Sequence, residues 1–152
     1  MPLRTYLQDI LRISIWNGET MALSLSFTKL HVQDAASAER FYAAALGLKT
    51  VARIEEFEGE HAMLEVIMTV LPSRAPAANL ILVSYPNRPR PAPGEAVTGF
   101  MVTDLEAALE RSVAAGATIE TPVTEVPEHG LRLAFILDPQ GHRVELLQRT
   151  AA

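Results

Sequence analysis

The sequence contains no cysteine among its 152 residues. This absence excludes disulfide bonds, thiol nucleophiles and metal sites built from cysteine, and it is typical of a reducing compartment. Long apolar runs are also absent, because no uncharged stretch approaches the roughly 18 residues that a membrane-spanning helix needs. Asp9 and Arg12 interrupt the region that a secretion signal would keep apolar. We therefore expect a cytoplasmic protein with no membrane segment.

Basic side chains are few. The 13 Lys and Arg residues stand against 18 Asp and Glu residues, which gives a formal net charge of −5 at pH 7. Nucleic-acid binding needs a concentrated basic face that neutralises phosphates. The only local basic cluster, Arg88 and Arg90, lies in a proline-rich stretch of the kind that forms solvated linkers. We therefore expect no nucleic-acid partner.

Apolar residues, in contrast, are plentiful. Hydrophobic residues make up 49% of the chain and charged residues 20%, which is the composition of a globular protein with a buried core. The length suits one compact domain or two small modules that share a core.

The first half of the patterned region reads as one strand, one helix and three strands. The alternating stretch from Ser24 to Val32 predicts a strand. Asp34 follows as a helix N-cap, apolar residues recur at helical spacing, and Gly47 ends the helix. Further strands are predicted at 48–57, 61–71 and 79–85, and a proline-rich linker at 86–94.

The same order returns after the linker. A strand is predicted at 96–103, a helix from Asp104 to Gly116, and strands at 117–126, 131–137 and 142–148. Asp104 repeats the role of Asp34, so the offset between the copies is 104 − 34 = 70, which indicates two copies of one supersecondary unit. One such sheet and helix cannot cover their own apolar surface, so the copies should pair. We predict an α+β fold in which two βαβββ modules, 24–86 and 95–149, form curved mixed sheets around a shared cleft, preceded by an N-terminal extension, 1–23.

Two motifs resemble a known superfamily. Residues 30–48 contain LHVQD, AERFY and LGL in that order, and residues 138–146 read DPQGHRVEL. The first run is similar to the opening of the vicinal oxygen chelate superfamily, and the second resembles its Asp-Pro-x-Gly-x-x-x-Glu-Leu hairpin. This superfamily includes glyoxalase I (lactoylglutathione lyase), extradiol dioxygenases, methylmalonyl-CoA epimerase, fosfomycin-resistance transferases and metal-free bleomycin-binding proteins. The resemblance covers residues 24–149 and implies the glyoxalase/bleomycin resistance fold.

The resemblance also implies where a metal would bind. In metal-dependent members, four cavity-facing side chains hold one divalent ion, and the matching positions here are Phe27, Leu82, Val97 and Glu145. Only Glu145 can ligate, whereas a hard cation needs several oxygen or nitrogen donors. His61 and Glu65 share a strand face, but nothing else joins them. We expect no metal cofactor, and a divalent ion only if a different residue set completes the site.

Two polar residues of the expected cleft have alternative interpretations. The glyoxalase I residue that matches His31 is an arginine that binds a carboxylate of the ligand, so the resemblance implies that His31 contacts an anionic group. A histidine bonded to backbone or water at the sheet end fits equally well. Glu145 resembles the base that removes a proton beside the substrate carbonyl, and apolar surroundings would make its carboxylate a better proton acceptor. Alternatively, Glu145 is a structural polar group whose hydrogen-bonding needs are met by a neighbouring strand.

The favoured function is that of a glyoxalase-like protein that binds a small organic ligand in an apolar cleft, with its metal site mostly lost. Glu145 is the catalytic candidate, and Phe27, His31, Leu82, Val97 and Met101 are the ligand-binding candidates. If the protein is an enzyme, we expect a carbon-sulfur lyase similar to lactoylglutathione lyase. The alternatives are a metal-dependent lyase of that kind and a drug-sequestering binder of the bleomycin-resistance kind. Two-fold pairing commonly closes open strand edges, so we also expect a homodimer.

Overall fold

The computed structural model describes residues 27–59, 62–70, 78–94 and 96–150. The predicted N-terminal extension, 1–23, lies outside these residues. The first module contains β1 (Phe27–His31), α2 (Ala35–Leu46), β2 (Lys49–Glu56), β3 (Met63–Thr69) and β4 (Asn79–Ser84). The second contains β5 (Val97–Met101), α3 (Leu105–Ala114), β6 (Thr118–Val126), the short 3-10 helix η1 (Pro127–His129), β7 (Leu131–Leu137) and β8 (Arg143–Arg149). The predicted order is confirmed, and η1 is the one described helix that the sequence pattern did not predict.

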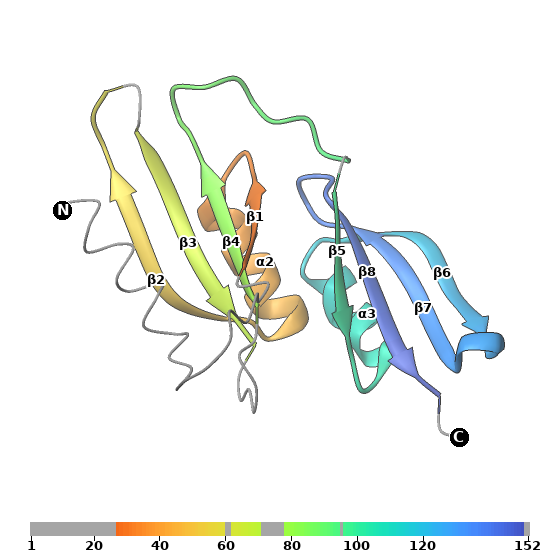
Figure 1. Cartoon of the computed structure of the whole chain (residues 1–152). Coiled ribbons are helices and arrows are strands. Elements are labelled where there is room, and N and C mark those ends of the chain that lie inside the picture. The colour runs from red at the N-terminus through yellow and green to blue at the C-terminus, as the bar shows by residue number, and fades with distance from the viewer. Residues whose placement is uncertain (1–26, 60–61, 71–77, 95, 151–152) are drawn as a thin grey trace, which may run out of the picture.

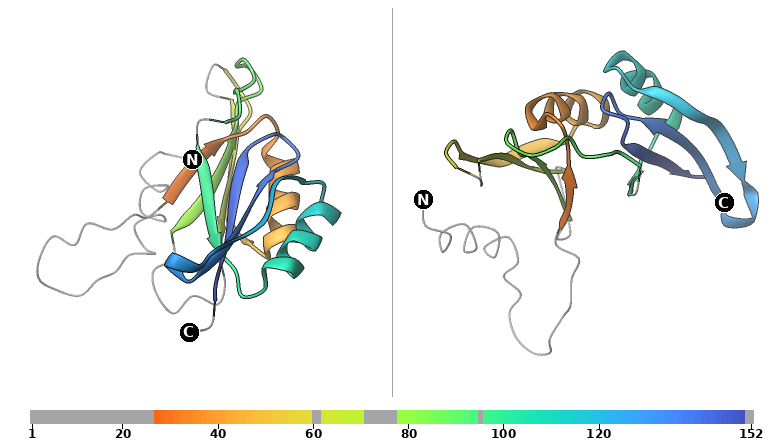
Figure 2. Two further views of the ribbon diagram at one scale, coloured as in Figure 1. Left: turned by 90° about the vertical axis from the view of Figure 1, so that its right-hand side faces the viewer. Right: turned by 90° about the horizontal axis from the view of Figure 1, so that it is seen from above.

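Each module builds one mixed four-stranded sheet. The strand orders are β1-β4-β3-β2 and β5-β8-β7-β6, in which β1–β4 and β5–β8 are the parallel pairs. β1 and β5 are therefore edge strands, and they lie towards the middle of the molecule (Figure 1). Both helices cover the same side of the two sheets (Figure 2, right). We call the side of each sheet that turns away from the helices its open face. No helix among the described residues is both long enough and apolar enough to span a membrane.

Both helices begin in the same way. The Asp34 carboxylate accepts a hydrogen bond from the Ser37 N–H at 3.0 Å, and the Asp104 carboxylate accepts one from the Ala107 N–H at 2.9 Å. These are the N-caps that the sequence predicts. Helix α2 ends at Gly47, whose φ of 73° is the left-handed conformation that favours glycine. The sequence repeat therefore reflects two copies of the same local structure.

One hydrophobic core joins the two modules. It lies between the helices and the helix-facing sides of both sheets, and α2 packs against α3. Its members from the first module include Leu30, Phe41, Val66 and Leu82, and those from the second include Leu105, Ile136 and Leu146. Each module thus covers the apolar surface of the other, as predicted.

The Asp-Pro-x-Gly hairpin is the polar joint between the modules. One Asp138 oxygen accepts hydrogen bonds from the N–H groups of Gln140 and His142, each at 2.9 Å, and the other accepts from the Tyr42 hydroxyl of α2 at 3.2 Å. Burial and the neighbouring Asp138 carboxylate raise the pKa of Tyr42, so its hydroxyl remains a donor. The Gln140 side chain bonds the backbone of Asp34 as both acceptor and donor. The motif therefore positions the N-terminus of α2 against the second module.

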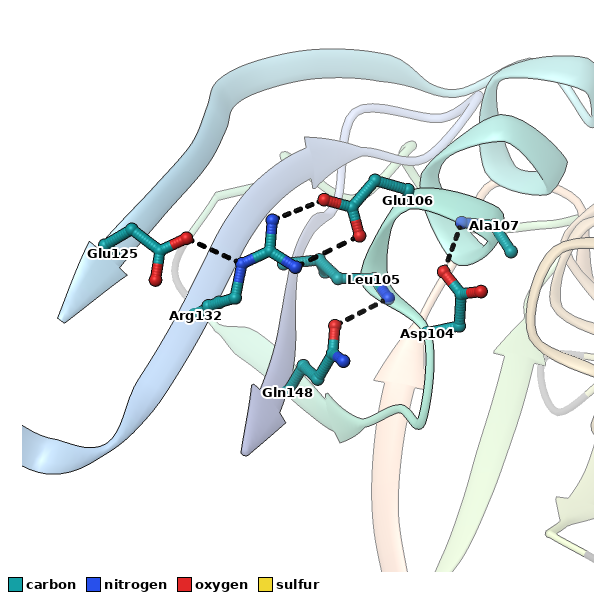
Figure 3. A network of polar contacts seen from close by, with 7 residues as sticks. All are labelled: Asp104, Leu105, Glu106, Ala107, Glu125, Arg132 and Gln148. Atoms are coloured by element: carbon teal, nitrogen blue, oxygen red, sulfur yellow. Dashed lines mark hydrogen bonds and ion pairs between the residues drawn. The ribbon is translucent and has the colours of Figure 1, made fainter. Parts of the chain in front are cut away.

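An arginine also ties each helix to its own sheet. Arg53 on β2 contacts Glu39 on α2 at 2.5 Å, and Arg132 on β7 bonds both Glu106 on α3 and Glu125 on β6 (Figure 3). Partial burial alone would raise the pKa of Glu39, but its hydrogen bonds outweigh this and lower it. Hydrogen bonds from Arg132 likewise lower the pKa of Glu106. The helix sides of the two modules are therefore built alike.

Candidate functional site

Strand register decides which side chains reach the open face of the first sheet. Leu30 on β1 pairs with Leu82 on β4, which pairs with Val66 on β3, and all three belong to the helix-side core. Successive side chains on a strand point to opposite faces. Lys29 and its partner Ile81 therefore face the open side, together with Phe27, His31, Glu65, Ile67 and Val83.

The prediction that Leu82 lines the cleft is wrong. Leu82 has no exposed surface and lies in the helix-side core. In the second sheet, Glu145 pairs with Gly99. The repeat counterpart of Gly99 is Lys29, which pairs with Ile81 in the first sheet. Ile81 is thus the structural counterpart of Glu145. A one-residue shift along a strand moves a side chain to the opposite face, which is why the sequence motif alone misplaced it.

The open face of the first sheet carries an ion pair that the sequence analysis did not find. Lys29 Nζ lies 2.7 Å from Glu65 Oε2, and the exposed fractions of the two side chains are 31% and 2%. The sequence pattern places Glu65 on one strand face with His61, which lies outside the described residues. The alternation of Lys29 with Phe27 and His31 was the available signal, because it placed a cation on the ligand-facing side.

His31 lies on the open face, as the strand pattern predicts, and its side chain is exposed. Its ring centroid is 5.6 Å from that of Tyr85, and the Arg88 guanidinium lies 4.0 Å from the centre of the Tyr85 ring. This stack joins the end of β1 to the start of the linker. The Arg88 guanidinium only donates hydrogen bonds, whereas the His31 ring and the Tyr85 hydroxyl can donate and accept them.

The open face of the second sheet is largely apolar. Val97 and Met101 on β5 are 48% and 58% exposed. By register and alternation, Leu133, Phe135, Leu137, Gly99 and Leu147 share this face. A contiguous set of exposed apolar side chains is typical of a ligand-binding or interaction surface.

Glu145 lies in the middle of that face. Its cross-strand neighbours are Gly99 and Phe135, and it is half-buried. Among the described residues, none forms a hydrogen bond or ion pair with its carboxylate. Arg143, two residues earlier, instead bonds Glu120 at 2.5 Å and stacks 4.1 Å from the Phe135 ring centre. Glu145 can therefore accept a hydrogen bond or a proton from a bound molecule.

The donor set does not fit a divalent metal ion. With Ile81 in place of Leu82, the four positions are Phe27, Ile81, Val97 and Glu145, and only the last carries a donor. In the part of the chain that the structure describes, no three His, Asp or Glu side chains gather into a possible metal site. A hard cation would keep most of its water shell there.

A pocket of about 430 Å³ lies away from these residues, near the N-terminus of α2. Its lining includes Gln33 and Asp34, whose N–H groups already donate to Gln140, and Leu64, which packs against the helix-side core. It contains none of the predicted site residues. The pocket therefore adds nothing to the chemistry of the open faces.

Comparison with known proteins agrees with the fold. The family model of the Glyoxalase/Bleomycin resistance protein/Dioxygenase superfamily matches residues 24–146. No curated protein matches the chain.

Several solved structures share the architecture. A glyoxalase family protein from Bacillus cereus is 17% identical with a TM-score of 0.71, and the match covers 91% of this chain and 100% of that one. A mutant of glyoxalase I from Zea mays is 21% identical with a TM-score of 0.70, covering 82% of this chain and 45% of that one. A glyoxalase-related enzyme from Fulvimarina pelagi is 20% identical with a TM-score of 0.61, covering 84% and 89%. The chain thus matches less than half the length of the maize protein.

Proposed function

The chain belongs to the Glyoxalase/Bleomycin resistance protein/Dioxygenase superfamily, and on this premise we propose that it binds a small organic molecule on the open faces of its sheets. The observation that carries the proposal is the apolar surface around Glu145. Val97 and Met101 are about half exposed there, whereas Ile67, Ile81 and Val83 on the open face of the first sheet are buried. Small-molecule sites are mostly apolar with a few placed polar groups, and this surface has that composition.

Glu145 supplies the polar group of the proposed site. It orients the ligand by accepting a hydrogen bond, and it is the group that would accept a proton if the bound molecule reacts. The donor set favours binding over metal-dependent lyase chemistry, because no second ligand lies at the matching positions and an enediolate would lack its main stabilising charge.

Binding without a metal has a direct test. We expect the purified protein, after dialysis against buffer without chelator, to hold no stoichiometric divalent ion by elemental analysis. About one tightly held ion per chain would contradict this part of the proposal.

We further propose that the functional unit is a homodimer. The outer edge strands of the two sheets are β2 and β6, which lie at the far sides of the molecule from β1 and β5 (Figure 1). Pairing with a second copy would cover such edges. Light scattering at micromolar concentration should give twice the chain mass of 16.6 kDa. A clean monomer would overturn the dimer but not the ligand site.

The ligand site itself can be tested with N-phenyl-1-naphthylamine, an uncharged fluorophore of apolar surfaces. Val97→Glu places a charge on the open face, and Val113→Glu is the matched control, because the exposed fractions of Val97 and Val113 are 48% and 47% and Val113 lies on α3. We expect saturable binding that weakens about tenfold in Val97→Glu and changes by less than about twofold in Val113→Glu. Absence of saturable binding, or equal effects of the two variants, would refute the proposal.

A further inference from the structure

The function proposed above does not explain the Lys29–Glu65 ion pair. We propose that Lys29, held by Glu65, binds an anionic oxygen group of the same ligand. The ligand is then an amphiphilic anion with an apolar body and one carboxylate, sulfonate or phosphate group. This inference rests on the proposed function, which supplies the surface for the apolar body.

The exposed fractions of the two side chains show which member of the ion pair a ligand can reach. The side chain of Glu65 is 2% exposed and that of Lys29 is 31% exposed, so an approaching molecule meets Lys29 and not the carboxylate of Glu65. An ammonium carries three N–H donors, and among the described residues only Glu65 accepts one of them, at 2.7 Å. The remaining donors of Lys29 are available to an oxygen acceptor.

The repeat shows that the fold does not require this pair. Gly99 stands at the position of Lys29 in the second module, one repeat offset later in the chain. In the first sheet, Val83 pairs with both Glu65 and His31. In the second sheet, Leu147 pairs with both Leu133 and Met101, the repeat counterpart of His31. Leu133 is therefore the counterpart of Glu65. The same sheet thus forms with glycine and leucine in place of lysine and glutamate. A buried ion pair contributes little net stability over apolar residues of similar size, so stability alone does not account for it.

The position of Lys29 suits a ligand that lies across the two sheets. β1 and β5 are the edge strands that lie towards the middle of the molecule, and both open faces are turned away from the helices (Figures 1 and 2). Lys29 therefore shares β1 and its open face with Phe27, and β5, the edge strand of the second sheet, presents Val97 and Met101. Ile67, Ile81 and Val83 surround the ion pair on its own sheet, and such apolar surroundings strengthen the attraction between an ammonium and an anion.

Two fluorophores that differ in one group test this inference. 1-Anilinonaphthalene-8-sulfonate carries a sulfonate that N-phenyl-1-naphthylamine lacks, and the ring systems are otherwise the same. We expect Lys29→Met to weaken sulfonate-probe binding about tenfold and to change uncharged-probe binding by less than about twofold. Lys49→Met is the matched control, because Lys49 begins β2, the strand farthest from β1 in the sheet. It should change neither.

A second variant guards against unfolding, because Lys29→Met leaves the buried Glu65 carboxylate without its ammonium. The double variant Lys29→Met, Glu65→Leu removes both charges and should show the same selective loss for the sulfonate probe, while Lys29→Arg should retain most of the binding. If the uncharged probe binds and the sulfonate probe is unaffected in both Lys29→Met proteins, the inference is refuted and the proposed function stands. If neither probe binds saturably to the unaltered protein, the proposed function fails and this inference fails with it.

Discussion

The two modules are alike on the helix side and different on the open face. Asp34 and Asp104 cap the helices with the same geometry, and an arginine ties each helix to its sheet. On the open faces, Glu65 is buried beneath Lys29 in the first sheet, whereas Glu145 lies half-buried and without such a partner among the described residues of the second. Packing explains the helix side, which both modules share. Because packing does not explain the difference between the open faces, we place the proposed ligand site there.

The largest effects should come from the shared helix-side core. Leu82 and Leu146 are both fully buried there, so Leu82→Ala and Leu146→Ala should each lower the free energy of unfolding by about 2–5 kcal/mol. Urea denaturation measures both. A loss below about 1 kcal/mol for Leu82→Ala alone would contradict its place in the shared core.

The next largest effect should be a difference in stability between variants of the two open-face carboxylates, Glu65 and Glu145. Glu65→Gln removes the charge that pairs with Lys29 in a buried setting, so we expect a loss of about 1–3 kcal/mol at pH 7. Glu145→Gln keeps the shape of a half-buried group and should change stability by less than about 0.5 kcal/mol. Denaturation midpoints of both variants decide the matter. The opposite ranking would contradict the distinction between a structurally paired and an available carboxylate.

A smaller difference should separate Tyr42 from Ser112, its counterpart in the second copy of the repeat. Tyr42 reaches across the module boundary to Asp138, whereas the Ser112 hydroxyl donates to Ala108 within its own helix. Tyr42→Phe should therefore cost about 1 kcal/mol, and Ser112→Ala clearly less. Thermal melts compare the pair. If Tyr42→Phe is neutral, the Asp138 hairpin is not the joint between the modules.

The smallest effect concerns the exposed ion pairs and depends on pH. Because the pKa of Glu106 is lowered in the folded state, its contribution is present above the unfolded value and disappears as pH falls through the folded one. Arg132→Gln should lower the melting temperature slightly at pH 7, and the difference should shrink as the pH falls through the acidic range in which Glu106 takes up its proton. Arg53→Gln should behave in the same way through Glu39. A difference that persists unchanged at pH 3 would exclude these carboxylates as its source.

Most of the fold could be predicted from the sequence because its signals are local. Asp34, Gly47 and Asp104 mark helix ends within one turn, and strand alternation is visible residue by residue. The site was less predictable because it depends on register. The repeat offset that relates β1 to β5 does not relate β4 to β8. Asn79 pairs with the first residue of β1, and Arg143 pairs with the first residue of β5. The separation between Asn79 and Arg143 in the chain is smaller than the repeat offset. The segments that connect the first and last strands differ in length between the two modules. An alignment by motif was therefore wrong by one residue at Leu82.

The missed ion pair has a related cause. Lys29 and Glu65 are 36 residues apart and meet only because β4 lies between β1 and β3 in the sheet. No short-range pattern links them. The exposure that separates Lys29 from Glu65 likewise depends on tertiary packing, so only the structure could distinguish a buried carboxylate from the more accessible Glu145.

The central claim is that the apolar open face around Glu145 is where a ligand binds. The most direct measurement is a nitrogen-15 chemical-shift titration of the whole protein with N-phenyl-1-naphthylamine. The largest saturable shifts should map to the amides of Val97, Gly99 and Met101 on β5 and of Glu145 on β8. Shifts confined to α2 and α3, or absent from β5 and β8, would contradict the claim.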